Sequence, residues 1–241
     1  MPATLIISDL HLVANQADSN KLFIKFAQQQ AVKFDQLFIL GDLFNTWIGD
    51  DLSIKSYAEI VKALGVLSRT TEIFVMVGNR DFLLGAEFAK KTKAKLIETP
   101  YLLQTGGQDY VLTHGDELCT DDENYQQLKK ILQHPLTKFI FLHLPKKIRL
   151  KLSGQLRKKS IQAQKYKPRE IMDVNQIAVD NLMRKYPGAN LIHGHTHRQN
   201  THSNKAYSRY VLGDWSAEKG NAIKIMDKID SKSSLSWLEI S

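Results

Sequence analysis

Aspartate, histidine and asparagine side chains recur in five short motifs along the sequence. The motifs are Asp9-Leu10-His11, Gly41-Asp42, Gly78-Asn79-Arg80-Asp81, Thr113-His114-Gly115-Asp116 and Gly194-His195-Thr196-His197. Imidazole nitrogens suit Mn, Fe and Zn ions, whereas carboxylate and amide oxygens suit harder cations. A mixed set of nitrogen and oxygen ligands without a thiolate therefore favours Mn²⁺, Fe or Zn over calcium.

The spacing within the motifs indicates how they would hold metal ions. In an extended Asp-x-His segment, side chains two residues apart point the same way, so Asp9 and His11 would bind one ion together. His195 and His197 would do the same with two imidazoles. The carboxylate of Asp42 has two oxygens and can bridge two cations. Glycines beside the ligands let the backbone turn sharply and let substrate come close.

Each motif taken alone has an ordinary structural explanation. A lone histidine is often structural, and Gly41-Asp42 by itself is typical of a simple turn. The ordered set is what predicts a metal centre, because a coincidence of all five motifs is far rarer than any one of them. The remaining histidines, His134, His143, His193 and His202, are interpreted as structural.

Four of the five motifs come directly after a short apolar run typical of a buried strand. Early strands are expected at 4–7, 37–40 and 73–77, and helical periodicity appears at 19–30 and 54–68. This alternation indicates βαβ units and a largely parallel sheet, where ligand sites lie beyond the carboxyl ends of the strands. The motifs should therefore converge in space.

The rest of the chain has a more antiparallel pattern. Short strands are expected at 101–104, 109–113, 190–193, 207–212, 221–227 and 234–239. We therefore expect an α/β fold with two packed sheets and helices outside them, in a single domain over residues 1–241.

Residues 126–169 form a basic block. It holds 13 of the 33 Lys and Arg residues and no Asp or Glu, so the rest of the chain has 20 basic and 25 acidic residues. Prolines and apolar residues recurring among the lysines predict a helical insertion. The charge indicates an anionic partner, which leaves nucleic acid, a nucleotide and an anionic membrane open. The plainer alternative is a helical hairpin that packs on the core with solvated lysines.

The single cysteine, Cys119, excludes an intrachain disulfide and fits a reducing compartment. The sequence shows neither a signal peptide nor the ~18 consecutive apolar residues of a membrane-spanning helix. We expect a protein of the cytosol or of a membrane surface facing it.

Three further segments narrow the interpretation. They are Trp47-Ile48-Gly49-Asp50-Asp51, Leu118-Cys119-Thr120-Asp121-Asp122 and Ile171-Met172-Asp173-Val174-Asn175-Gln176. Together with the metal motifs, they make the chain resemble the calcineurin-like metallophosphoesterases and, among these, the UDP-2,3-diacylglucosamine pyrophosphohydrolases of lipid A biosynthesis, over nearly its full length. The resemblance implies two packed mixed β-sheets flanked by helices, an α/β/β/α sandwich, with residues 126–169 as a helical lid.

The resemblance also implies a reaction. Enzymes of this family are manganese-dependent and lie at the cytoplasmic side of the inner membrane as peripheral proteins. They hydrolyse the pyrophosphate bond of UDP-2,3-diacylglucosamine by attack of metal-activated water on the alpha phosphorus, giving UMP and 2,3-diacylglucosamine 1-phosphate (lipid X). Two Mn²⁺ ions are implied, one held by Asp9, His11, Asp42 and His197 and the other by Asp42, Asn79, His114 and His195.

The implied substrate site involves both the metal motifs and the basic block. Its residues are Asn79, Arg80, Asp122, Ser160, Gln164, Lys167 and His195, with Tyr125 and Arg157 as weaker candidates. Gln164 departs from the family pattern, in which Asn is usual. No nucleic acid is expected as a partner. Cations for phosphates and apolar residues for acyl chains are what a lid over a lipid-bearing nucleotide requires.

Arg80 separates the possible substrates by its chemistry. Many phosphatases of the superfamily have a histidine there, which can protonate an alkoxide leaving group. Arginine keeps its proton but can bind two phosphate oxygens and stabilise charge in the transition state. A phosphate monoester leaves unaided because its last pKa is only about 6. We therefore predict that Arg80 is catalytic and that the substrate is a pyrophosphate. The alternative is that Arg80 is only a surface charge.

Two other functions remain as alternatives. A metal-dependent nuclease, or another phosphodiesterase of the superfamily, would also use these ligands and a basic insertion. Against a nuclease, the aromatic residues of the insertion are only Phe139, Phe141 and Tyr166, whereas base-stacking surfaces use more exposed rings. A non-catalytic scaffold on the same fold would be free to lose metal ligands, and all seven are present.

Overall fold

The computed structural model describes residues 3–14, 17–166, 171–226 and 234–241. The chain first forms β1 (Thr4–Ile7), α1 (Ala17–Gln29), a short 3-10 helix (Ala31–Lys33), β2 (Gln36–Leu40), α2 (Asp50–Ser56), α3 (Ala58–Leu67), β3 (Glu72–Met76), α4 (Ala86–Thr92) and β4 (Lys95–Ile97). It continues with β5 (Tyr101–Thr105), β6 (Gln108–Thr113), a second 3-10 helix (Asp116–Leu118), α5 (Glu123–Gln133), α6 (Pro135–His143), α7 (Lys146–Tyr166) and α8 (Gln176–Met183). The final strands are β7 (Asn190–His193), β8 (Asn200–Ser203), β9 (Ser208–Val211), β10 (Gly220–Met226) and β11 (Ser234–Ile240).

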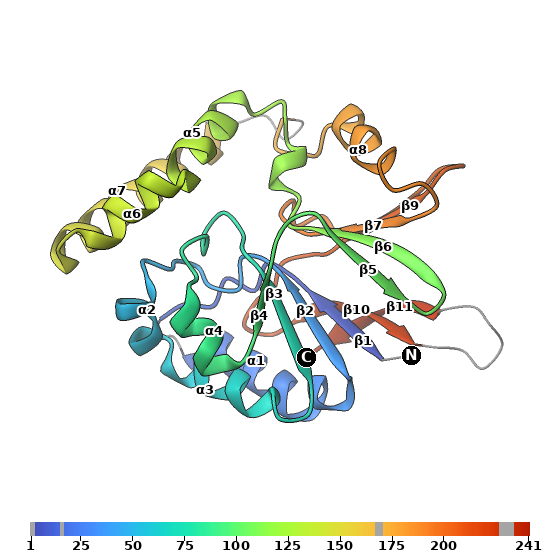
Figure 1. Cartoon of the computed structure of the whole chain (residues 1–241), viewed down its shortest axis with the longest axis horizontal. Coiled ribbons are helices and arrows are strands. Elements are labelled where there is room, and N and C mark those ends of the chain that lie inside the picture. Colours follow the sequence, from blue (N-terminus) through green and yellow to red (C-terminus); the bar gives the residue numbers. More distant parts are fainter. Residues whose placement is uncertain (1–2, 15–16, 167–170, 227–233) are drawn as a thin grey trace.

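These strands form two sheets that pack face to face (Figure 1). The first has the order β11-β10-β1-β2-β3-β4, and the second has the order β5-β6-β7-β9-β8. Strands β1 to β4 run parallel, while β10 runs antiparallel to β1. In the second sheet β6, β7 and β9 are parallel and the two flanking strands antiparallel. Both sheets are therefore mixed, as expected.

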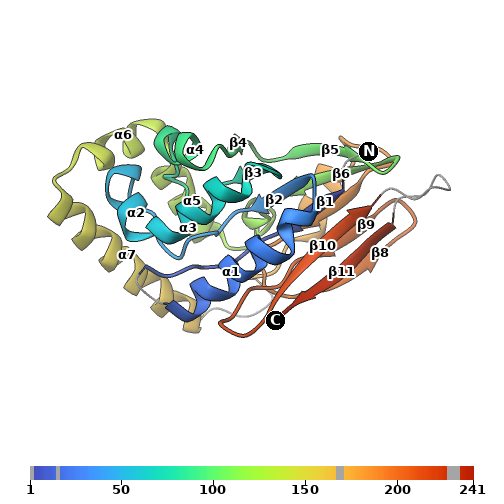
Figure 2. The same cartoon turned by 90° about the horizontal axis from the view of Figure 1, so that it is seen from below.

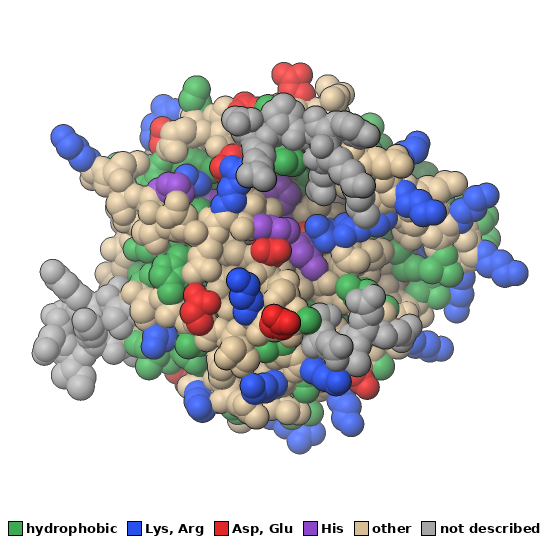
Figure 3. Space-filling view, turned by 180° about the vertical axis from the view of Figure 1, so that it is seen from behind, with side chains coloured by type: hydrophobic (Ala, Val, Ile, Leu, Met, Phe, Trp, Pro, Cys, Tyr) green, Lys and Arg blue, Asp and Glu red, His purple; other side chains and the backbone are tan. Residues whose placement is uncertain are grey.

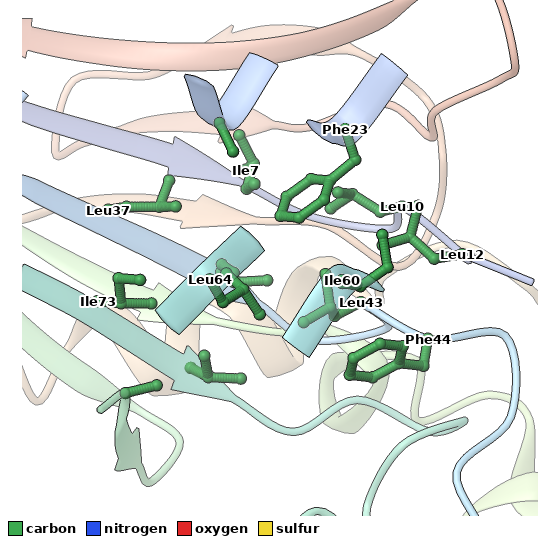
Figure 4. Packing of buried hydrophobic residues seen from close by; sticks show 14 of the residues in the cluster. Ile7, Leu10, Leu12, Phe23, Leu37, Leu43, Phe44, Ile60, Leu64 and Ile73 are labelled. Carbon is green, nitrogen blue, oxygen red and sulfur yellow. The ribbon is translucent and has the colours of Figure 1, made fainter. Parts of the chain in front are cut away.

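Three apolar layers hold the sheets and helices together. Along β1, Leu5 and Ile7 point to one face and Ile6 to the other, because side chains alternate along a strand. The first face packs against α1, α3 and α4, and Figure 4 shows Phe23, Ile60 and Leu64 in this layer. The second face packs between the sheets, and a third layer joins the second sheet to α8. The order of layers is the expected α/β/β/α sandwich.

The predicted helix at 54–68 is two helices. Tyr57 has φ −118° and ψ 31°, ends α2 and precedes α3. Its hydroxyl donates to the carbonyl of Thr46 at 3.1 Å, and its ring packs against Phe44 and Trp47. The apolar spacing continues through both helices, so it does not reveal this break. Helices α4 and α8 and strands β4 and β8 were not predicted either.

The described part of the basic insertion is helical. Helices α5, α6 and α7 extend to one side of the sandwich, next to α2 (Figures 1 and 2). Many of their apolar side chains are exposed: Ile131 is 61% exposed, Leu136 60%, Phe139 59% and Ile140 53%. Among the described residues, no helix is both long and apolar enough to cross a membrane.

Candidate metal centre

The predicted ligands lie where strands of both sheets end. Asp9, Asp42 and Asn79 follow β1, β2 and β3, while His114 and His195 follow β6 and β7. These strands are parallel within each sheet, so their carboxyl ends lie at the same edge. Figure 3 shows histidine side chains near the middle of one face, with acidic and basic side chains beside them. The convergence expected from the sequence is therefore present.

One group of ligand atoms joins Asp9, His11 and His197. His197 Nε2 lies 3.1 Å from His11 Nε2 and 3.4 Å from Asp9 Oδ1. His11 Nε2 lies 3.9 Å from the same oxygen. Ligand atoms bonded at about 2.0–2.2 Å to one ion are about 3–4 Å apart, so these spacings fit a shared cation.

Asp42 lies between this group and a second one. Its Oδ2 is 3.7 Å from His11 Nδ1, while its Oδ1 is 3.9 Å from His114 Nε2. The Asp42 carboxylate thus lies between His11 and His114, one from each group. Asp9, Asp42 and His114 also form a group of closely spaced ligand atoms. The His195 ring lies beside this group, with its centroid 5.0 Å from that of His114.

The contacts of Asn79 and Asp9 fit a cation. The amide oxygen of Asn79 faces only acceptors, with Asp42 Oδ2 at 2.9 Å, Asp42 Oδ1 at 3.3 Å and His114 Nε2 at 3.2 Å. If the amide were turned over, its nitrogen would donate to these three atoms. In the present orientation the amide oxygen and these acceptors repel one another unless a cation or a proton lies among them. Asp9 Oδ1 is buried without a hydrogen-bond donor in the described chain. The donor set therefore suits a divalent metal ion.

The protonation of the centre fits the same conclusion. Burial lowers the pKa of His11 to about 2 and that of His195 to about 3, so these imidazoles are neutral and have lone pairs for a metal ion. Burial opposes protonation of His114 too, but the charges of Asp42 and Asp9 raise its pKa to about 9. Burial raises the pKa of Asp42 to about 7. Without a metal ion, protons thus compensate the buried carboxylates, and a metal ion would displace them.

The backbone at the ligands is not extended, which corrects the sequence-based interpretation. Asp9, His11, Asp42, His195 and His197 have φ of 55°, 49°, 51°, 67° and 57°. The side chains converge because the loops turn through the left-handed region, not because they alternate along a strand. Hydrogen bonds between neighbouring loops hold these turns, including His11 N to Asp42 O at 2.9 Å and Asp9 N to Gly41 O at 3.2 Å.

Two glycines leave room for the ligand carboxylates. A Cβ on Gly78 would lie 2.2 Å from Asp42 Oδ1, and a Cβ on Gly194 would lie 2.2 Å from Asp9 Oδ2. Any larger residue at either position would displace a carboxylate. The sequence predicts that these glycines let substrate come close. At Gly78 and Gly194 the group that comes close is a ligand carboxylate.

A surrounding layer of hydrogen bonds orients the ligands. His114 Nδ1 donates to the Leu40 carbonyl at 2.8 Å, which directs Nε2 into the centre. Asp214 Oδ2 lies 3.5 Å from His197 Nδ1. The buried Asp81 accepts from Gly78 N at 2.8 Å and Phe44 N at 3.3 Å, and so joins the loops after β2 and β3. Carboxylates behind metal-binding histidines increase their basicity. Asp81 belongs to one of the five sequence motifs, which gave it no role, and Asp214, which has no distinctive spacing, was not singled out.

Arg80 points into the centre and is not a surface charge. Its Nε lies 3.3 Å from Asp42 Oδ2, and its side chain is 16% exposed. Its Nη1 donates to Asn45 Oδ1 at 2.9 Å, and the same oxygen accepts from Arg157 Nη2 at 2.6 Å. Two guanidinium groups, one from the loop after β3 and one from α7, therefore meet beside the metal ligands. The role of Asn45 was not predicted, since an isolated asparagine carries no motif.

The other predicted substrate residues lie on or near the insertion. Asp122 caps the N-terminus of α5 and accepts a hydrogen bond from Tyr125 N at 3.1 Å. The Tyr125 ring lies 6.1 Å from that of His195. Ser160 is an exposed residue of α7. Gln164 belongs to α7, but its side chain lies outside the described part of the structure, and Lys167 lies wholly outside the described residues.

Comparison with known proteins agrees with this arrangement. The family model of the calcineurin-like phosphoesterases matches residues 3–199. The chain belongs to this family. A solved archaeal phosphodiesterase aligns with 98% of this chain and 99% of its own at 12% identity and a TM-score of 0.46, which adds nothing to the family assignment.

Curated relatives within the family are much more similar. A UDP-2,3-diacylglucosamine hydrolase of Histophilus somni (strain 129Pt) is 42% identical over 219 residues, which cover 90% of this chain and 94% of the relative. The protein of the same name from Shewanella loihica is 42% identical over 230 residues, which cover 95% and 94%. The one from Serratia proteamaculans is 41% identical over 227 residues, which cover 92% and 94%. The chain is therefore a calcineurin-like phosphoesterase of the group that carries this name.

Proposed function

We propose that the chain hydrolyses the pyrophosphate bond of UDP-2,3-diacylglucosamine, a step of lipid A biosynthesis. Water adds to the phosphorus attached to uridine, the bond from that phosphorus to the bridging oxygen breaks, and UMP and lipid X are released. The observation that carries the proposal is the guanidinium of Arg80 beside Asp42, where a phosphatase acting on alkyl esters needs an acid. The names of the similar relatives support the substrate.

Two divalent ions, which we propose to be Mn²⁺, would be held by the ligands described above. Asp9, His11, Asp42 and His197 would hold one, and Asp42, Asn79, His114 and His195 the other. Bound ions supply an activated water and neutralise charge on the phosphoryl oxygens. Hydrogen bonds from the protein orient two of these ligands. The His114 ring donates to Leu40 O, and the Asp42 carboxylate accepts from Arg80 N.

Arg80 would bind the oxygens of the attacked phosphate. Its guanidinium is already directed toward Asp42, and it carries a permanent positive charge. Charge that develops in the transition state is stabilised best by donors that need no reorientation. The lipid X phosphate departs without a proton donor, because its last pKa is only about 6. Arg157 lies close enough to Arg80 to bind the same diphosphate.

The exposed apolar residues of α5 to α7 favour a lipid-bearing substrate and contact with a membrane surface, which we propose to be the cytoplasmic side of the inner membrane. Leu136, Phe139 and Ile140 lie among lysines on α5 to α7. Apolar side chains that enter the lipid and lysines that pair with anionic headgroups are the features of surface-bound helices. We therefore propose residues 126–169 as the part that contacts both acyl chains and membrane.

The direct test is incubation with UDP-2,3-diacylglucosamine and Mn²⁺, followed by mass analysis of the products. UMP and lipid X are expected. UDP or free phosphate as product would contradict the proposed bond cleavage, and turnover of single-stranded DNA in place of the lipid would favour a nuclease.

The membrane proposal has its own test. Wild type should sediment with vesicles of mixed neutral and anionic phospholipid, and Leu136→Ser with Ile140→Ser should reduce this binding. Val66, 50% exposed on α3, offers a matched control as Val66→Ser. Equal vesicle binding by both variants and wild type would place the membrane contact elsewhere.

A further inference from the structure

A path of hydrogen bonds leads from Arg209 on β9 to the Asp9 carboxylate. Arg209 is only 8% exposed, and its Nη1 lies 3.3 Å from Nε2 of His193, a fully buried residue at the end of β7. His193 Nδ1 lies 2.9 Å from the carbonyl oxygen of Gly194. The next backbone N–H, that of His195, donates to Asp9 Oδ2 at 2.8 Å.

Arg209 determines where the proton of His193 lies. A guanidinium only donates hydrogen bonds, so Nε2 of the imidazole must accept and the proton must be on Nδ1. Nδ1 then donates to the Gly194 carbonyl. The two partners of the ring therefore place its proton on Nδ1.

The Gly194–His195 peptide passes this orientation on. The carbonyl oxygen and the following N–H of a trans peptide point in opposite directions. Holding the oxygen toward His193 therefore turns the N–H toward Asp9 Oδ2. That contact leaves Oδ1 of Asp9, which is buried and has no hydrogen-bond donor in the described chain, facing His11 and His197.

The peptide needs such a restraint because of its conformation. His195 has φ of 67°, a left-handed conformation that is unfavourable for a residue other than glycine. The His193 ring also packs under the loop that carries His114, since a Cβ on Gly115 would lie 2.9 Å from Nδ1. One buried ring thus supports two of the ligand loops.

We propose that Arg209 and His193 are positioning residues of the metal centre. Arg209 selects the tautomer of His193, which fixes the Gly194–His195 peptide, so that Asp9 presents Oδ1 and His195 its imidazole to a metal ion. Neither side chain touches the substrate. The inference rests on the proposed metal-dependent function.

The test is the affinity of the full chain for Mn²⁺, measured from the electron paramagnetic resonance signal of free Mn²⁺. Arg209→Met should weaken binding by about tenfold, the lower end for partners behind metal ligands. The Mn²⁺ affinity of Arg209→Lys should lie between those of wild type and Arg209→Met, because the lysine ammonium can still donate a hydrogen bond to His193. Arg184→Met, a change of an exposed arginine after α8, should bind as wild type.

Two measurements on His193 decide the proposal even if Arg209→Met does not fold. His193→Asn keeps a donor for the Gly194 carbonyl and should bind Mn²⁺ more tightly than His193→Leu. Nitrogen-15 spectra of wild type should show the His193 proton on Nδ1. Equal Mn²⁺ affinity of Arg209→Met and wild type, or a proton on Nε2, would overturn the proposal. Wild type that binds no Mn²⁺ would instead contradict the proposed function, and the tautomer would still test the hydrogen-bond path.

Discussion

Arg149 of α7 and Asp51 of α2 join the helical insertion to the sandwich through two parallel hydrogen bonds. Arg149 Nη1 donates to Asp51 Oδ1 at 2.9 Å and to the Ile48 carbonyl at 3.0 Å, and Nη2 donates to Asp51 Oδ2. The arginine is 3% exposed. Its replacement would leave the insertion without this buried attachment, while the metal ligands stay unchanged.

Arg149→Met should therefore reduce hydrolysis only of substrates whose binding needs the insertion. We expect hydrolysis of UDP-2,3-diacylglucosamine to fall by about tenfold, since hydrogen bonds to charged groups contribute about 1.5–3 kcal/mol. Metal-dependent cleavage of a small chromogenic phosphodiester should stay within about twofold of wild type. Lys147→Met, on the same helix but exposed, is the control. A parallel loss of both activities would show that Arg149 supports the whole fold and not the insertion.

The proposed bridging role of Asp42 predicts that its loss removes both ions. Asp42→Ala should lower kcat/KM by about a thousandfold, the several kcal/mol that metal ions contribute to phosphoryl transfer. A chelator should abolish wild-type activity, and Mn²⁺ should restore it. Glu59→Ala, on the exposed side of α3, should be unaffected. Full turnover in chelator would exclude a metal mechanism.

The placement of Arg80 beside the centre predicts which phosphorus is attacked. Hydrolysis in ¹⁸O-labelled water should place the label in UMP, because the phosphate attached to uridine would lie on the ions and on Arg80. Mass analysis of both products measures this. Label found in lipid X would mean that the other phosphorus is attacked and that Arg80 binds the leaving phosphate.

The buried Cys119 should be unreactive in the native protein. Burial raises the pKa of its thiol to about 12, and nearby carboxylates such as Asp116 add to the effect. The native thiol is therefore protonated at pH 8, and alkylation by iodoacetamide should be at least about tenfold slower than in urea. The same shift affects stability, because the Cys119 thiol ionises near pH 9 in the unfolded chain but only near pH 12 in the folded one. The free energy of unfolding should therefore fall as the pH rises from 9 toward 12. Fast labelling of folded protein would contradict the burial.

The convergence of the proposed ligands could be predicted from the sequence because it depends on local patterns. Apolar runs mark β1, β2 and β3, and parallel strands bring their ends together whatever the loops do. The conformations of those loops could not be predicted. The left-handed turns at Asp9 and Asp42 are imposed by hydrogen bonds between neighbouring loops, such as His11 N to Asp42 O, which join segments distant in sequence.

The supporting residues were missed for a related reason. Asn45, Asp214 and Arg209 are single polar residues without a repeated spacing, and each has its role only through a partner elsewhere in the chain. His193 was interpreted as structural from its type alone. Its contacts agree with that but place the structural role directly behind the metal ligands.

The order of the first sheet has a consequence for synthesis of the protein. Strand β1 pairs with β10, although nearly the whole described chain separates these two strands in sequence, and β10 then pairs with β11. While the ribosome is still translating the segments between, one edge of β1 has no partner in this sheet. Unpaired strand edges promote aggregation, and His195 and His197 also emerge late. A nascent chain should thus depend on a chaperone until its last strands are released, and it should gain its metal ions only after that.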